Sequence, residues 1–136
     1  MLTLARIARV LERACTDLTL AQYRLLALIS DGAERASHLA GELALTKPTV
    51  SATIDTLVER ELVKREAVDG DRRATRLTVT ESGRAALLRA ESSMRERLDD
   101  VVARVDDPVA LRRSLAHLQA ALDERRDERR AARTRP

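Results

Sequence analysis

The chain has 136 residues, the length of one domain, and its single cysteine excludes a framework of intramolecular disulfides. Only 1% of the residues are aromatic, so the core must consist mainly of Leu, Val, Ile and Ala, which suits long helices. The formal net charge is +3, and no apolar run approaches the ~18 residues that a transmembrane helix needs, which excludes a helical membrane protein.

Three helices are expected in the first third of the chain. A short one lies within residues 1–16, and a second covers residues 19–30, because Thr19 and Gln22 have the spacing of a capping box. A third is predicted over residues 37–43, with its first residue, a serine, as the cap. The side chains of the second helix that we expect to face inward are Tyr23, Leu26 and Ala27.

The clearest helix signal begins at Thr46. Threonine is a favoured N-cap, and Pro48 falls in the first turn, where a missing N–H costs no hydrogen bond. The helix is predicted to run through Arg60. Apolar residues at helical spacing should form its inner face, namely Val50, Ile54, Leu57 and Val58.

The opposite face of this helix carries small polar side chains near its N-terminus. A helix can read a major groove, roughly 12 Å wide, only if its side chains can reach and hydrogen-bond the base edges. Thr46 and Lys47, at the start of the helix, are further candidates for contacts with DNA. The expected base-edge contacts are Thr49, Ser51, Ala52 and Asp55.

A β-hairpin is predicted after this helix. Residues 62–65 and 75–79 form its strands, and the second strand alternates apolar Leu77 and Val79 with polar residues. The turn is expected at residues 68–70, which contain an Asp-Gly pair.

Basic residues are concentrated on the hairpin, although positive and negative side chains nearly balance between residues 31 and 84. Such a local patch can attract phosphates. Asp71 precedes Arg73 by two residues and can hold its guanidinium in one direction, which suits a narrow minor groove. The alternative is that these are simply solvated charges. The phosphate contacts that we expect are Lys47, Lys64, Arg65, Arg72 and Arg76.

Two more helices are predicted. The first follows an N-cap at Thr80, and the second begins at Pro108. The second helix is expected to continue into the charged tail at residues 123–136. Each has a narrow apolar stripe, and the first includes Leu87, Met94 and Val105. A twofold dimer would cover both stripes, whereas the alternative is an intramolecular core alone. The predicted dimerisation residues are Leu98, Val101, Leu111, Leu115, Leu118 and Leu122.

These features together resemble the MarR family of winged helix-turn-helix regulators. The family's Asp-x-Arg is present at residues 71–73, and its Leu-Thr-x-x-Gly is present at residues 79–83 with Val in place of Leu. Residues 18–30 and 38–51 are also similar to the family, and the resemblance covers about residues 5–90.

The resemblance implies a mainly α fold with a small β-hairpin wing. Residues 19–84 would form the winged helix-turn-helix, and residues 1–18 and 85–136 a helical dimerisation region. It further implies a homodimer that binds a partly palindromic operator in double-stranded DNA, usually as a repressor, and is released by a small molecule or by oxidation. By analogy the effector pocket would involve Tyr23, Leu26 and Met94.

The chain departs from the family pattern in two places. Ala52 and Thr56 stand where many members have basic residues, and the first helix is shorter than is usual. Together with the balanced average charge, this favours an alternative function, a winged-helix module that binds protein rather than DNA.

No catalytic, metal-binding or cofactor-binding motif is present, because His38 and His117 are far apart and lack partners at ligand spacing. Cys15 invites comparison with the family's peroxide sensors, but Tyr23 is the one tyrosine in the sequence, and we expect a small, partly buried hydrophobe there. We therefore expect a cytoplasmic regulator without an enzymatic activity, a cofactor or a membrane partner.

Overall fold

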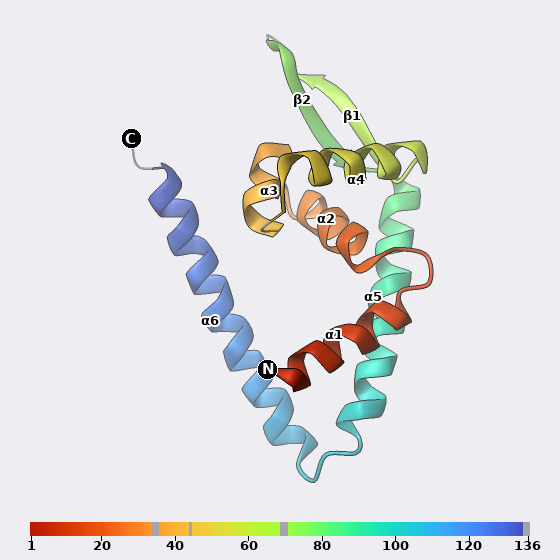
Figure 1. Ribbon diagram of the computed structural model, residues 1–136, viewed down its shortest axis with the longest axis vertical. Helices are drawn as coiled ribbons and strands as arrows, with labels where there is room; N and C mark the ends of the chain where they lie inside the picture. Colours follow the sequence, from red (N-terminus) through yellow and green to blue (C-terminus); the bar gives the residue numbers. More distant parts are fainter. Residues whose placement is uncertain (34–35, 44, 69–70, 135–136) are drawn as a thin grey trace. The chain divides into compact units, whose positions relative to one another are not determined.

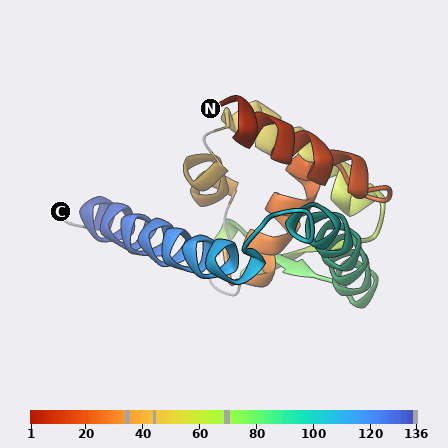
Figure 2. The ribbon, with the colours of Figure 1, turned by 90° about the horizontal axis from the view of Figure 1, so that it is seen from below.

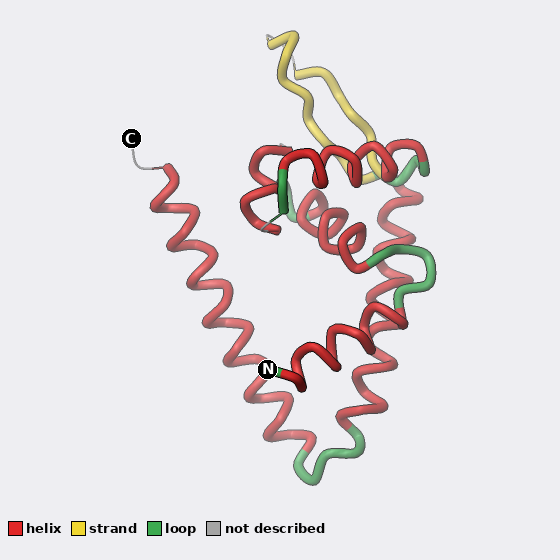
Figure 3. The backbone as a smooth tube through the Cα atoms, in the orientation of Figure 1, coloured by secondary structure: helices red, strands yellow, loops and turns green. Residues whose placement is uncertain are grey.

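The computed structural model describes residues 1–33, 36–43, 45–68 and 71–134, and it is mainly helical with one hairpin (Figure 1; Figure 3). The chain divides into two compact units, Met1–Leu98 and Asp99–Pro136, each of which is described by itself. The elements in chain order are α1 (Leu2–Ala14), α2 (Leu20–Ser30), α3 (Ala36–Leu43), α4 (Lys47–Glu59), β1 (Val63–Val68), β2 (Asp71–Val79), α5 (Glu81–Val102) and α6 (Pro108–Thr134).

The start of α2 confirms the predicted capping box. The Thr19 backbone N–H donates to Gln22 Oε1 at 3.0 Å, and the Gln22 N–H donates to Thr19 Oγ1 at 3.1 Å. Two donors that a helix start leaves unpaired are thereby satisfied by one local exchange. Helix α3 begins at Ala36, one residue before the predicted start, and the predicted cap at Ser37 lies outside the side chains that the structure describes.

The core of the first unit is formed by α2, α3, α4, the base of the hairpin and the inner face of α5. In α2, Leu25 and Ile29 are buried together with Leu26, whereas Tyr23 and Ala27 are only partly buried. The predicted stripe was too narrow because α2 contacts α3, α4 and β2, so a wider arc of its surface is covered. The largest fully buried side chains are Leu25, Leu26, Leu39, Val50, Ile54, Leu57 and Val63.

The hairpin is an antiparallel pair with Val63 opposite Val79 and Arg65 opposite Leu77. Its base is anchored because Val63 and Leu77 are buried, which confirms the expected alternation of the second strand. The register shifts between residues 67 and 68. The Asp-Gly turn that the sequence predicts, at residues 69–70, lies outside the described residues.

The apolar stripes of the two long helices differ in part from those that the sequence predicts. Leu87 and Met94 of α5 are buried within the first unit, so they form part of its own core rather than a surface for a partner helix. Because α5 ends at Val102, Val105 lies in the following turn and does not continue the helical stripe. Helix α6 begins with Asp107 Oδ1 accepting from the Ala110 N–H at 2.9 Å, and it extends to Thr134 (Figure 2).

The segments that connect the hairpin to α4 and to α5 pack closely against each other. Glu61, just after α4, has φ of 55°, a left-handed conformation that normally favours glycine. Thr80 Oγ1 donates to the Glu61 carbonyl at 2.7 Å and accepts from the Gly83 N–H at 2.9 Å, which confirms Thr80 as a cap. The Thr80 N–H donates to the Leu62 carbonyl at 3.1 Å. Helix α5 is thereby fixed against the base of the wing.

Gly83 is required by this close approach. A Cβ there would clash with the Leu62 carbonyl oxygen and lie 2.8 Å from Val79 Cγ1. Alanine normally stabilises a helix interior by about 1 kcal/mol relative to glycine. We expect Gly83→Ala instead to lower the free energy of unfolding by about 1–3 kcal/mol, as overpacking does, in urea denaturation. Ser82→Ala, at an exposed neighbouring position, is the control, and equal stability of both variants would contradict the close contact.

Candidate nucleic-acid interface

Helix α4 has two chemically different faces. Val50, Ile54 and Leu57 are at most 1% exposed, and the helix packs against α2, α3 and β1. Thr46 caps it by accepting from the Thr49 N–H at 3.4 Å, as the sequence predicts. The predicted base-edge residues Thr49, Ser51, Ala52 and Asp55 are all exposed.

One flank of α4 borders an open hollow of about 400 Å³ against the start of α2. Thr53 Oγ1 donates to the Thr49 carbonyl at 2.8 Å, and Thr56 Oγ1 donates to the Ala52 carbonyl at 3.0 Å. Because both hydroxyl protons are used inside the helix, these oxygens present acceptors outward. The lining residues are Thr19, Gln22, Thr49, Ala52, Thr53 and Thr56.

Arg60 ties the end of α4 to the beginning of α2. Its Nη2 donates to the Asp17 carbonyl at 2.7 Å, and its Nη1 donates to Gln22 Oε1 at 3.3 Å. The Asp17 carboxylate in turn accepts from Arg89 Nε of α5 at 3.2 Å. From the sequence, Arg60 is predicted only to end the helix, because its partners are 38 and 43 residues away and leave no local pattern.

Two predicted contact residues are brought together. Arg65 Nη2 of β1 lies 2.6 Å from Asp55 Oδ1 of α4, and the side chains are 44% and 52% exposed. Because water screens such a pair, it contributes only about 0–1 kcal/mol to stability. Its effect is mainly geometric, since it joins the wing to the exposed face of α4.

The remaining basic candidates are distributed along α4 and the wing. Lys47 and Lys64 are exposed, and Arg76 is exposed with an interaction of its own. Asp71, Arg72 and Arg73 belong to β2, but their side chains lie outside those that the structure describes. Their roles therefore stay predictions from the sequence.

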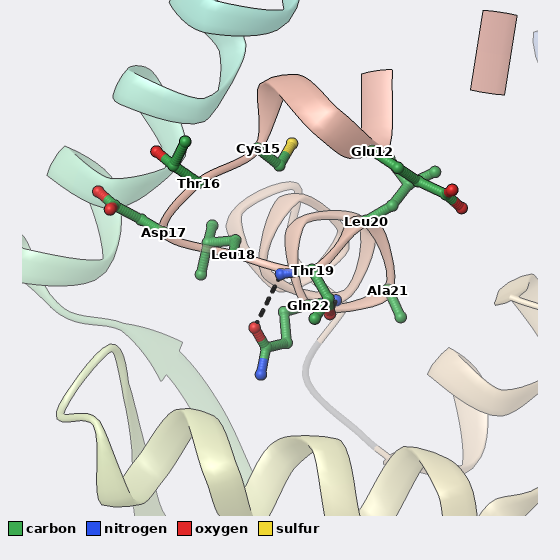
Figure 4. Close-up of a pocket in the computed structure, with 9 residues that line it drawn as sticks. All are labelled: Glu12, Cys15, Thr16, Asp17, Leu18, Thr19, Leu20, Ala21 and Gln22. Atoms are coloured by element: carbon green, nitrogen blue, oxygen red, sulfur yellow. Dashed lines mark hydrogen bonds between the residues drawn. The ribbon is translucent and has the colours of Figure 1, made fainter. Parts of the chain in front are cut away.

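The predicted effector residues lie in or against the core. Leu26 and Met94 are buried, and Tyr23 packs beside them. Burial and then the nearby Glu91 carboxylate, which also hydrogen-bonds the tyrosine, raise the pKa of the Tyr23 hydroxyl. A hollow of about 530 Å³ lies nearby, formed by the end of α1, the following turn and the first turn of α2 (Figure 4). It is lined by other residues, namely Glu12, Cys15, Thr16, Asp17, Leu18, Thr19, Leu20, Ala21 and Gln22.

The predicted dimerisation residues differ in exposure. Leu98 and Leu111 are partly buried, and Val101 is 43% exposed. Along α6, Leu115 is 40% exposed, and Leu118 and Leu122 are each 52% exposed. The second unit thus presents a row of leucines to solvent.

Two features are absent from the part of the chain that the structure describes. None of its helices combines the length and the apolar character that crossing a membrane requires. No group of three or more His, Cys, Asp or Glu side chains within the described ranges is placed to hold a metal ion.

Comparison with known proteins identifies the fold. Residues 16–74 match the model of the MarR family. The transcriptional repressor CouR bound to a 23-mer DNA duplex is 27% identical, with a TM-score of 0.74 over 89% of this chain and 87% of CouR. No curated protein sequence gives a significant match.

Two further solved structures are similar. The M. tuberculosis transcriptional regulator MOSR in complex with DNA is 28% identical, with a TM-score of 0.62 over 91% of this chain and 92% of MOSR. Wild-type E. coli MarR in its apo form is 19% identical, with a TM-score of 0.72 over 90% of both chains, a likeness of fold. The expected winged-helix fold is therefore confirmed.

The pKa of the Cys15 thiol provides a test of the burial of this side chain. Burial raises the pKa of its thiol, so less of the reactive thiolate is present at neutral pH. We expect the rate of alkylation by iodoacetamide to rise with a midpoint at higher pH in the folded protein than in the same protein in urea. A folded-state midpoint below that of the unfolded chain would indicate an activated thiol.

Proposed function

We propose that this chain, whose residues 16–74 match the model of the MarR family, is a transcriptional regulator of that family and binds a specific DNA sequence as a homodimer. The observation that carries this proposal is that the exposed face of α4, which has small side chains, lies beside a hairpin whose base is anchored in the core. The buried residues of α4 fix the opposite face outward, and the wing lies next to it (Figure 1).

In the proposed complex, the two α4 helices of the dimer enter successive major grooves about one helical turn apart. Base-edge contacts come from Thr49, Ser51, Ala52 and Asp55. Arg73 of each wing lies in the flanking minor groove, oriented by Asp71, as the resemblance implies. Phosphate contacts come from the basic side chains Lys47, Lys64, Arg65, Arg72 and Arg76, with Thr46 at the helix start.

Relatives support a DNA partner. CouR and MOSR, both above 25% identity and each similar over most of the chain, are described as DNA-bound proteins, and CouR as a repressor. We extend both properties to this chain as proposals. The regulators of this family are not enzymes, and we propose no catalytic activity for this one.

We assign residues 19–84 to DNA reading, and residues 1–18 and 85–136 to dimerisation. The support for a dimer is the row of exposed leucines on α6, since a second copy would remove this apolar surface from water. We further propose that a small molecule bound near Tyr23, Leu26 and Met94 modulates DNA binding, as the resemblance implies.

The DNA assignment is tested by selecting duplexes from a random pool and measuring their affinity by fluorescence anisotropy. We expect an inverted repeat, with Arg73→Ala weakening binding by about 1–3 kcal/mol while leaving the fold intact. The affinity should also fall with salt, with a log–log slope of about −0.9 for each phosphate contacted. Circular dichroism of the variant is the control for folding.

Weak binding that is unselective and indifferent to Arg73 would favour the alternative, a winged-helix module that binds protein. The balanced charge of the region and the absence of basic side chains at Ala52 and Thr56 favour that alternative. A protein adaptor would also show almost no salt dependence with DNA.

The dimer is tested at Leu118, which is 52% exposed on α6. Leu118→Glu would bury a charge in the proposed interface, and we expect association to weaken by about 2 kcal/mol or more, the range of interface hot spots. Sedimentation velocity across a concentration series measures this. Ala116→Glu, an exposed position off the leucine row, is the control; an unchanged dimer in Leu118→Glu would place the interface elsewhere.

A further inference from the structure

The ion pair between α4 and β1 fixes the orientation of an acidic side chain on the proposed DNA-reading face. Arg65 Nη2 contacts Asp55 Oδ1 at 2.6 Å, and about half of each side chain remains exposed. Asp55 follows Ser51 by one helical turn, so the two lie on the same side of α4. With Oδ1 held by the guanidinium, the second carboxylate oxygen, Oδ2, is left to accept from a partner.

A carboxylate restricts what that partner can be. It has acceptors only and is repelled by phosphate, so in duplex DNA it requires an amino group on a base edge. In the major groove the amino groups are cytosine N4 and adenine N6. Adenine places the acceptor N7 beside its amino group, and this lone pair repels a carboxylate. Cytosine has no acceptor at that place, so it is the better partner.

We infer that Asp55 reads the N4 amino group of one cytosine in each half-site, and that Arg65 is a positioning residue that directs Oδ2 toward it. This inference rests on the proposed function. It also changes the expected role of Arg65, whose guanidinium serves first to orient Asp55 and only secondarily to meet phosphate.

A purely structural role for the pair, in which it only holds the wing against α4, makes a different prediction. In that case, breaking the ion pair would weaken binding to all DNA sequences about equally. A base-reading role changes the preference at one position of the half-site and leaves the other positions unaltered. The base preference, rather than the affinity, therefore separates the two roles.

The experiment is duplex selection with the full-length wild type and with Asp55→Asn. The new amide should keep its oxygen on Arg65 and present its NH₂ to the groove, where it can donate but not accept. Thymine O4 is an acceptor at the place of cytosine N4, so the preference should change from cytosine to thymine at one position. The expected discrimination is roughly ten- to a hundredfold.

Glu59→Gln is the matched control. It removes the same charge from the same helix one turn later, at an exposed position, and should leave every base preference unchanged. Thermal unfolding of both variants tests whether they fold equally well.

The positioning role of Arg65 is tested in the Asp55→Asn background. Adding Arg65→Ala frees the amide to turn over, so the discrimination between cytosine and thymine should be lost. Adding Arg65→Lys, which keeps a donor at this place, should retain part of it.

An Asp55→Asn protein that binds well but keeps all base preferences of the wild type would overturn the inference. The ion pair would then have only the structural role of holding the wing against α4. An unchanged thymine preference in the double variant would overturn the role of Arg65. A wild type that selects no sequence would instead contradict the proposed function, and this inference with it.

Discussion

The burial of one face of α4 is the constraint on which the rest of the structure depends. Val50, Ile54 and Leu57 lose nearly all contact with solvent against α2, α3 and β1. A helix whose inner stripe is fixed in this way has no freedom to rotate about its axis, because rotation would expose these side chains to water. The small polar side chains opposite are therefore presented outward by the core itself.

Polar contacts then fix the helix at its edges. Arg60 binds the Asp17 carbonyl and Gln22 at the start of α2, and the Asp55–Arg65 pair joins α4 to the wing. These contacts are exposed and contribute little to the free energy of folding. Their value is directional, because a guanidinium offers several donors in a fixed plane and so holds its acceptors in a defined orientation. The proposed reading of DNA depends on this orientation as much as on surface charge.

Local signals in the sequence predicted the elements well. The caps at Thr19, Thr46 and Thr80 each involve residues within three positions, so their spacing alone identifies the helix starts. Contacts between distant segments were not predictable. Periodicity cannot show how many neighbours cover a helix, so the buried arc of α2 was underestimated; nor can it show that Leu87 packs inside its own unit rather than against a partner. The DNA-contact residues themselves stay predictions.

We propose that α4 and its wing form the surface that contacts DNA. Hydrogen–deuterium exchange of the protein, with and without a selected duplex, measures this directly, because a bound duplex slows exchange at the amides it covers. We expect slower exchange in the N-terminal half of α4 and in the hairpin. Unchanged exchange in both elements, with protection confined to α6 or to other helices, would contradict the account.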